Sequence, residues 1–259
     1  MYNLLKCEFM KLRKSREFTY ILSGICVVSL VILIQRIYQM EVFIKHMGEE
    51  YAIQGVHCFM NMTSKPYIVV ILSTIFAVLS VCRDFHDRIV QSTVLCGYSR
   101  IKMIFSKVIV IYSAVAAFVA AYVFICPLGV GILYGFGMEL NMAIIMKIIR
   151  MYLLCVMTVC AVASAAAIVA YIFRNSALST VVWFTCLFLY VFCIIGAEGA
   201  FGLCQPVDFI VNNSFLMLLG MVELDMRSGD ILRIVLANSA AIISLFLVKC
   251  FIFQRTELK

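Results

Sequence analysis

A polar stretch between residues 83 and 107 has the residue types best suited to contact with another molecule. It separates two long apolar runs and carries five basic and two acidic side chains. Charges of both signs fix the register of a short element against a partner surface. This stretch therefore predicts docking by charge and shape, without making or breaking bonds. The charged residues are Arg83, Asp84, Asp87, Arg88, Arg100, Lys102 and Lys107.

Residues Arg88 to Cys96 can form a short helix within this stretch. Gly97 follows at a point where glycine can adopt the left-handed conformation that ends a helix, and Ser99 can cap the next helix. A short helix held at the membrane surface between two spans can push on a soluble partner or be pushed by it. The same charges also suit a plain topogenic loop, which stays open as the alternative.

Common catalytic and metal-binding patterns are absent from the sequence. There is no GxxxxGK[ST] phosphate loop, no HExxH and no GxSxG, and the three histidines stand far apart. The twelve cysteines form no CxxC pair and mostly lie in apolar runs, so we expect small buried side chains and no metal site. Cys58 and Cys204 fall in segments expected outside, where a disulfide has weak support. The chain is predicted not to be an enzyme.

The composition defines the environment that must position these residues. Of the 259 residues, 64% are hydrophobic and 14% are charged, with a mean hydropathy of +1.07. Soluble domains carry about 25% charged residues. The sequence therefore predicts an all-α membrane protein with no nucleic-acid partner. Few prolines and no repeat are visible, so residues 1–259 are expected to form one transmembrane domain.

Six apolar runs are long enough to cross a bilayer, which takes roughly 20 residues and at least about 17. The third run contains Pro127, which removes a backbone donor and predicts a turn or a loosened exit. No Asp, Glu, Lys or Arg stands near the middle of a run, which argues against an ion-coupled transporter. Arg233 and Lys249 are expected to extend to opposite membrane faces. The runs are Phe18–Ile34, Pro66–Cys82, Val108–Met138, Met151–Phe173, Asn175–Ala197 and Ile231–Phe253.

Residues 1–17 are expected to form an amphipathic helix on the membrane surface. Tyr2, Leu5, Phe9 and Leu12 share one helical face, and basic side chains cover the remainder. A disordered basic leader that only fixes orientation is the alternative.

Two further features concern packing near the end of the chain and in the fourth run. The segment 197–230 contains an apolar run, Phe209–Val222, that is too short to span and predicts a re-entrant or interfacial helix before the last span. The fourth run carries many alanines between Ala161 and Ala170. Such a face suits either a compact bundle that shifts as a unit or ordinary tight helix packing.

The placement of Lys and Arg predicts the orientation. Fourteen of these residues fall in the loops that include the leader, 83–107 and the C-terminal end, against seven in the opposite set. The positive-inside rule then puts both termini and 83–107 in the cytosol.

Three short motifs together resemble the membrane subunits of bacterial type-2 ABC exporters. They are Glu8-Phe9-Met10-Lys11-Leu12-Arg13-Lys14, Gly97-Tyr98-Ser99-Arg100 and Ser106-Lys107. The six spans, the surface helix, the re-entrant segment and the basic C-terminal end extend the resemblance along the whole chain. Arg88-Ile89 stands where many relatives carry Gly-Thr, and this departure affects the contact expected of the short helix.

The resemblance implies a permease half that dimerises, with itself or a related permease, and binds two copies of a separate ABC ATPase subunit. It implies no cofactor on this chain, since ATP and Mg would lie on the ATPase. The implied coupling residues are Asp87, Arg88, Ile89, Gln91, Ser92, Leu95, Gly97, Tyr98, Ser99 and Arg100. The implied elbow-helix residues are Leu5, Glu8, Phe9, Lys11 and Leu12.

The expected cargo is hydrophobic or amphipathic, because no charge stands in the middle of a span. Small members of the family with compact external segments resemble exporters of amphipathic peptides, including toxins, bacteriocins and their immunity systems. Peptide export across a bacterial cytoplasmic membrane is therefore favoured, with membrane lipids as further partners. Lipid or hydrophobic drug efflux is the alternative, and a non-transporting scaffold or sensor is another.

Overall fold

The computed structural model describes residues 2–47, 55–87, 89, 95–137, 141–198 and 213–255. All regular elements in these ranges are helices, and six of them are long and apolar enough to cross a membrane. The predicted all-α, six-span fold class is confirmed. The helices are α1 (Tyr2–Lys14), α2 (Arg16–Met47), α3 (Gly55–Ser64), α4 (Tyr67–His86), α6 (Arg100–Tyr134), α7 (Met142–Phe173), α8 (Ser176–Glu198), α10 (Phe215–Gly220) and α11 (Ser228–Arg255).

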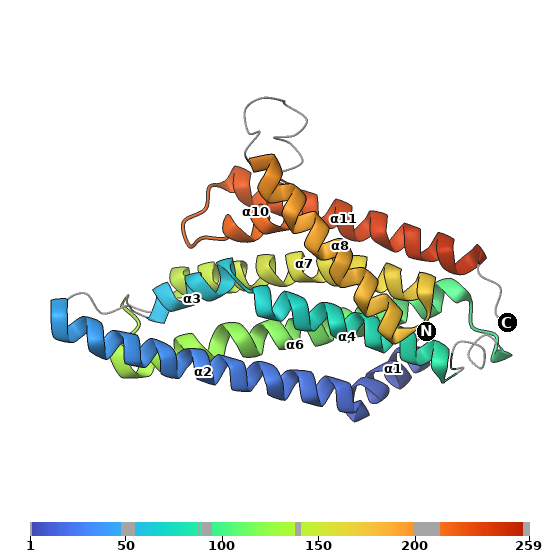
Figure 1. The fold of residues 1–259 in the computed structure, drawn as a ribbon, viewed down its shortest axis with the longest axis horizontal. Helices are drawn as coiled ribbons and strands as arrows, with labels where there is room; N and C mark the ends of the chain where they lie inside the picture. The colour runs from blue at the N-terminus through green and yellow to red at the C-terminus, as the bar shows by residue number, and fades with distance from the viewer. Residues whose placement is uncertain are drawn as a thin grey trace.

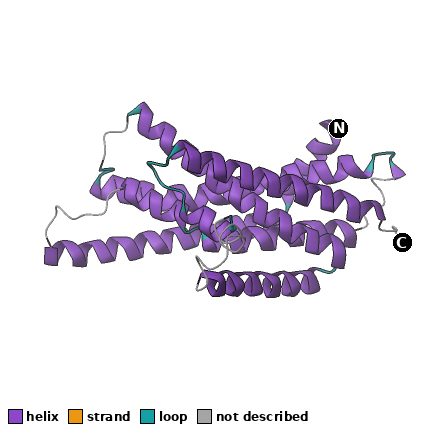
Figure 2. Cartoon of the chain, turned by 90° about the horizontal axis from the view of Figure 1, so that it is seen from above, coloured by secondary structure: helices purple, strands orange, loops and turns teal. Residues whose placement is uncertain are grey.

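The helices form an elongated bundle with the start of the chain and the end of α11 at the same end (Figures 1 and 2). We call this the terminal end. The connection from α4 to α6 also lies there, whereas α3, α10 and the beginning of α7 lie toward the opposite end (Figure 1). The chain therefore brings α1 and the predicted docking stretch together.

The spans divide into an inner and an outer set. Within the most apolar part of each helix, 67% of α7 and 56% of α4 is buried, against 11% of α2 and 11% of α11. Half of α6 is buried in the same measure. The helices α4, α6 and α7 thus make the core, while α2, α8 and α11 turn most of their apolar surface outward.

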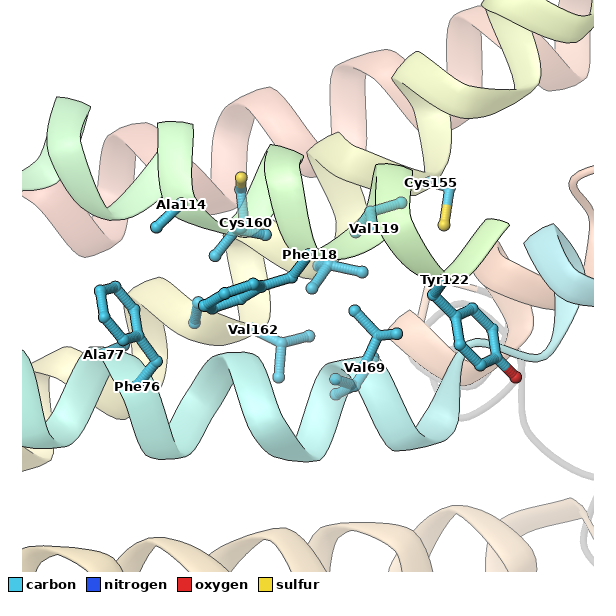
Figure 3. Close-up of a cluster of buried hydrophobic side chains, with 14 of the residues drawn as sticks. Val69, Phe76, Ala77, Ala114, Phe118, Val119, Tyr122, Cys155, Cys160 and Val162 are labelled. Carbon is cyan, nitrogen blue, oxygen red and sulfur yellow. The ribbon is translucent and has the colours of Figure 1, made fainter. Parts of the chain in front are cut away.

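The core is built from large side chains of α4 and α6 against small ones of α7. Phe118 stacks on Phe18 at a ring distance of 5.4 Å and meets the edge of Phe76 at 5.3 Å. Figure 3 shows Phe76 and Phe118 within this cluster, beside Cys160 and Val162 of α7. Alanines on α7 let its backbone approach α4 closely, as small residues do where lipid provides no hydrophobic drive between helices.

Between the first two predicted spans, the described residues 41–47 and 55–64 are helical. Helix α2 continues to Met47, and α3 is a buried helix that packs against α6. The first N–H groups of α3 are satisfied, because Gly55 N donates to the Gly135 carbonyl at 3.1 Å and Val56 N to Phe136 at 3.4 Å. A helix start needs such partners when it is buried. With ten residues, α3 is too short to be predicted as a span.

The predicted turn or loosened exit at Pro127 is wrong, because α6 continues through this residue. It continues to Tyr134 and ends at Gly135, whose φ is 85°. The region around Pro127 is where α3 packs on α6, and the glycines there leave room for a close approach. The missing N–H of a proline is tolerated in a membrane helix when neighbouring groups compensate.

The segment 197–230, predicted to hold a re-entrant or interfacial helix, lies only partly within the described residues. Residues 199–212 lie outside the described residues, but α10 follows them and packs on α7. Ser214 caps α10 by accepting a hydrogen bond from Met217 N at 3.4 Å. Phe215 stacks on Tyr190 of α8 at a ring distance of 5.0 Å. This short helix therefore packs on protein, as a non-spanning segment must.

We predict that Gly55→Ala lowers the thermal stability of the purified protein in detergent. A methyl group on Gly55 would lie 3.0 Å from the Gly131 Cα and 3.1 Å from the Pro127 carbonyl oxygen, so two backbones would have to separate. Gly24→Ala in α2 is the matched control, because nothing lies within 4 Å of its added methyl group. Alanine is also the better helix former by about 1 kcal/mol. Equal melting temperatures for the two variants would contradict the close α3–α6 contact.

Candidate functional site

Helix α1 lies against the terminal end of the bundle through one narrow face. Leu4 and Glu8 are buried, and α1 packs on the beginning of α6. The sequence predicted a face of Tyr2, Leu5, Phe9 and Leu12; of these, Leu5 and Leu12 are half-buried whereas Tyr2 and Phe9 are exposed. The apolar face therefore points largely away from the bundle, where a surface helix would meet lipid.

Four charged side chains link α1, α4 and α6 at this end of the bundle. The ammonium of Lys107 on α6 lies 2.7 Å from Asp84 on α4 and 3.6 Å from Glu8 on α1. Lys11 forms a further ion pair with Glu8. Two basic and two acidic side chains thus balance at the point where the docking stretch enters and leaves the bundle. We call Glu8, Lys11, Asp84 and Lys107 the ion cluster.

The ion cluster is largely withdrawn from water. The side chains of Glu8 and Lys107 are each 8% exposed, and that of Asp84 is 14% exposed. Burial by itself lowers the pKa of Lys11. The hydrogen bond to Glu8 and the charges nearby outweigh burial, so the pKa of Lys11 lies above its ordinary value. Removing one member of such a buried pair costs about 3–5 kcal/mol, because the other charge is left unpaired. Each of the three helices is therefore held in place by the other two.

Aromatic contacts link the ion cluster to α7 and α11, and we call the cluster and these contacts together the joint. Phe85, next to Asp84, lies 5.9 Å from the ring of Tyr171 and 6.2 Å from that of Phe253. The guanidinium of Arg174 lies 5.4 Å from the Phe85 ring centre, a favourable cation–π distance. Arg100 Nη1 donates to the Phe253 carbonyl at 3.2 Å, which ties the start of α6 to the end of α11.

The space beside the ion cluster is too small for a ligand. A cavity of about 30 Å³ is lined by Glu8, Asp84, Lys107 and Tyr171, among others. Such a volume holds about one water molecule. The ion cluster is therefore a contact between helices, without room for a substrate among its own side chains.

The described residues of the predicted coupling stretch lie at its two ends. Helix α4 continues to His86 and α6 starts at Arg100, so much of 83–107 belongs to the span helices. Asp87 caps α4, Gly97 has a φ of 82°, and Ser99 precedes α6 without a side-chain cap bond. Gly97 thus has the predicted left-handed conformation. Arg88, Gln91 and Ser92 lie outside the described residues, with most of the predicted coupling helix.

Three of the described coupling residues differ in exposure. Ile89 is half-buried and lines the small cavity of the joint. Tyr98 is half-buried, whereas Leu95 is 87% exposed. Among the described residues of the stretch, Leu95 is therefore the apolar side chain most available to another protein.

Two side chains with possible chemistry are buried away from this joint. Lys249 on α11 is 1% exposed and packs within the bundle, whereas the sequence predicted a side chain that extends to a membrane face. Cys58 on α3 is a free thiol whose sulfur lies 3.6 Å from that of Cys126, and Cys204 lies outside the described residues. Among the residues that the structure describes, no three metal-ligand side chains come together.

Sequence reasoning identified Glu8 and Lys11 but did not pair them with Asp84 and Lys107. The four charges come from three segments, and periodicity within one segment says nothing about pairing between segments. One signal was available: Glu8 is the only acid in an otherwise basic helix of thirteen residues. An isolated acid on such a helix indicates a specific basic partner.

The fold defines a multi-pass helical membrane protein with its polar joint at one end. Residues 4–193 match the family described as ABC-2 family transporter protein. The chain therefore belongs to this family, and it is a membrane permease component of an ABC-2 type transporter without an ATPase domain. Permeases of this kind generally pair with ATPase subunits. None of the curated proteins matches the chain.

We predict that Lys107→Met lowers the free energy of unfolding by about 3–5 kcal/mol, because Asp84 and Glu8 are left buried without their shared cation. Lys102→Met on the same helix is the control, since Lys102 is exposed and should change little. Chemical unfolding of the purified protein measures both effects.

A double variant separates charge from packing in the same experiment. Asp84→Asn added to Lys107→Met should recover part of the loss, because one of the unpaired carboxylates is removed. Strictly additive losses would show that the two side chains act independently and would contradict the ion cluster.

Proposed function

We propose that this chain is the permease half of an ATP-driven exporter that works as a dimer and couples to two copies of a separate ATPase through residues 87–100. The supporting observation is the joint at the terminal end. The connection between α4 and α6 is tied at both of its ends to α1 through the ion cluster, while the side chain of Leu95 within it is exposed. A displacement of this connection would reach three helices at once.

The proposed orientation puts the terminal end in the cytosol. Fourteen Lys and Arg residues fall on that side of the chain against seven on the other. An ATPase subunit would then meet the connection and α1 side by side. Residues 1–259 would form one permease domain, in a bacterial cytoplasmic membrane.

Arg100 has a contact within the bundle besides the coupling role expected for it. Its guanidinium bonds the Phe253 carbonyl at 3.2 Å, so reversing this charge would disturb the bundle as well as any docking surface. Leu95 is the cleaner probe of docking, because its side chain is exposed and its replacement should leave the fold unchanged.

The proposed cargo is a hydrophobic or amphipathic peptide, exported as a toxin or antimicrobial peptide or removed for immunity. The outward faces of α8 and α11 are apolar, which suits movement of such cargo beside lipid. Lipid or hydrophobic drug efflux is the second candidate, and both classes can be compared in proteoliposomes that contain the permease and its ATPase.

We predict that Leu95→Asp abolishes co-purification of the ATPase subunit and leaves the thermal stability of the permease unchanged. A charge placed in an apolar seat costs desolvation without a partner. Met142→Asp is the matched control, because Met142 is 76% exposed at the opposite end of the bundle. Retention of the ATPase by Leu95→Asp, or its equal loss from both variants, would contradict docking at residues 87–100.

A further inference from the structure

A second cavity, far larger than the one in the joint, lies between α8 and α11. Its volume is about 350 Å³, and its walls come from α7, α8, α10 and α11. In the described residues, α8 and α11 both pack on α7 but make little contact with each other. The cavity is therefore a gap between two spans, with α7 as its floor and α10 at one side.

Small side chains on facing helices create this gap. Ala161 and Ala165 of α7 line it from one side, and Ala237 and Ala241 of α11 from another. The other α7 alanines, such as Ala163 and Ala166, are fully buried in the core. The alanine face predicted from sequence thus has two parts, one packed and one open. An open apolar space leaves its lining without contacts unless another molecule fills it.

The lining is aromatic and neutral with a few polar groups. Trp183 and Tyr190 of α8 and Phe215 of α10 contribute rings, and no Asp, Glu, Lys or Arg is among the described residues that line it. The Trp183 indole nitrogen is buried and has no hydrogen-bond partner in the described part of the chain. Tyr190 already accepts a bond from Phe215 N at 3.1 Å.

Asn238 adds a buried amide at membrane depth. It is 3% exposed and donates to Thr158 Oγ1 at 2.9 Å, which fixes the orientation of its side chain. The amide oxygen remains available as an acceptor beside an apolar space. A mostly apolar pocket with one or two placed polar groups is typical of small-molecule sites.

We propose that this cavity binds a neutral, single-chain amphiphile that enters from the bilayer between α8 and α11. A charged group is disfavoured, because no counter-charge lines the cavity and an unpaired buried charge is costly. The volume stands near the lower limit of about 300–1,000 Å³ for ligand pockets. It therefore accommodates one chain with a hydroxyl or amide group, and not a two-chain phospholipid. The site belongs to a single subunit and does not depend on the export function proposed above.

The chain provides its own reporter for this site. Trp183 is the one tryptophan in the sequence, and it lines the cavity. Purified protein in phosphatidylcholine nanodiscs is titrated with a brominated medium-chain fatty alcohol, since bromine quenches tryptophan fluorescence on contact. Saturable quenching at a low mole fraction of the alcohol is the expected result.

Two neighbouring alanines give a matched pair of variants. Ala241→Leu fills the cavity and should weaken the saturable quenching about tenfold or more, as extra methylenes do in a fitted pocket. Ala240→Leu makes the same change on the exposed side of α11 and should leave it unchanged. If Ala241→Leu does not fold by size exclusion and circular dichroism, Ala165→Val fills the same space from α7.

A reference tryptophan separates the pocket from general exposure to lipid. Phe192 is 68% exposed on the outer face of α8, so Phe192→Trp in a Trp183→Phe background reports the surrounding bilayer. Quenching of Trp183 that rises linearly, as at this position, would overturn the proposal. Equal quenching by brominated phosphatidylcholine would assign the cavity to bulk lipid. No quenching at all would show that a second copy or the chain itself covers the cavity. Either result also overturns the proposal.

Discussion

The buried charge of Lys107 is the constraint on which the terminal end depends. An ammonium at this depth is stable only with anions beside it, and its two anions come from different helices, Asp84 of α4 and Glu8 of α1. The cluster therefore fixes the angle at which α1 meets the bundle and the distance between the two ends of the α4–α6 connection. Apolar packing alone is less directional, since lipid chains contact an apolar helix face as well as another helix does.

The rest of the bundle is organised around a rigid centre. Helices α4 and α7 are close to each other because alanines of α7 permit it, whereas the glycines of α6 lie against α2 and α3, and α3 closes the opposite end against α6. At that opposite end, Lys147 lies 2.5 Å from Asp225 and Arg150 bonds the Leu224 carbonyl at 2.7 Å. The start of α7 is thereby tied to the segment before α11. Polar ties thus occur at both ends of the core, and apolar contacts fill the length between them.

The sequence predicted the spans because their signal is local. A run of uncharged residues reveals a membrane helix regardless of its neighbours, so all six were found, although helices such as α4 and α6 extend beyond the apolar runs. Helix α3 was missed because ten residues are too few to span a membrane, and its burial comes from contact with α6. The prediction of a turn at Pro127 was wrong for a related reason, because the helix there is supported by neighbours that the local sequence does not show.

The functional residues were predicted less completely, because most of their roles are relations between segments. Glu8 and Lys11 were placed on the elbow helix, but the pairing with Asp84 and Lys107 joins positions up to 99 residues apart, for which a single sequence gives no signal. Gly97 was predicted correctly because a left-handed helix end is a local requirement that glycine meets. The cavity between α8 and α11 was not predicted at all. Alanines were visible in the fourth run, but whether a neighbour fills the space beside them depends on where α8 and α11 lie.

The two sets of helices have different mechanical consequences. A force on the α4–α6 connection acts first on the ion cluster and on Phe85, and these side chains hold α1, α4, α6, α7 and the end of α11. Because the α4, α6 and α7 core is closely packed, it resists deformation and would transmit such a force as a rigid body. Helix α8 packs on α4 and α7 and makes little contact with α11, so few contacts hold α8 and α11 to each other in the described bundle. The gap that Trp183 and Asn238 line lies along this boundary, so its width depends on how α8 and α11 each pack on α7 and not on contacts between the two helices themselves.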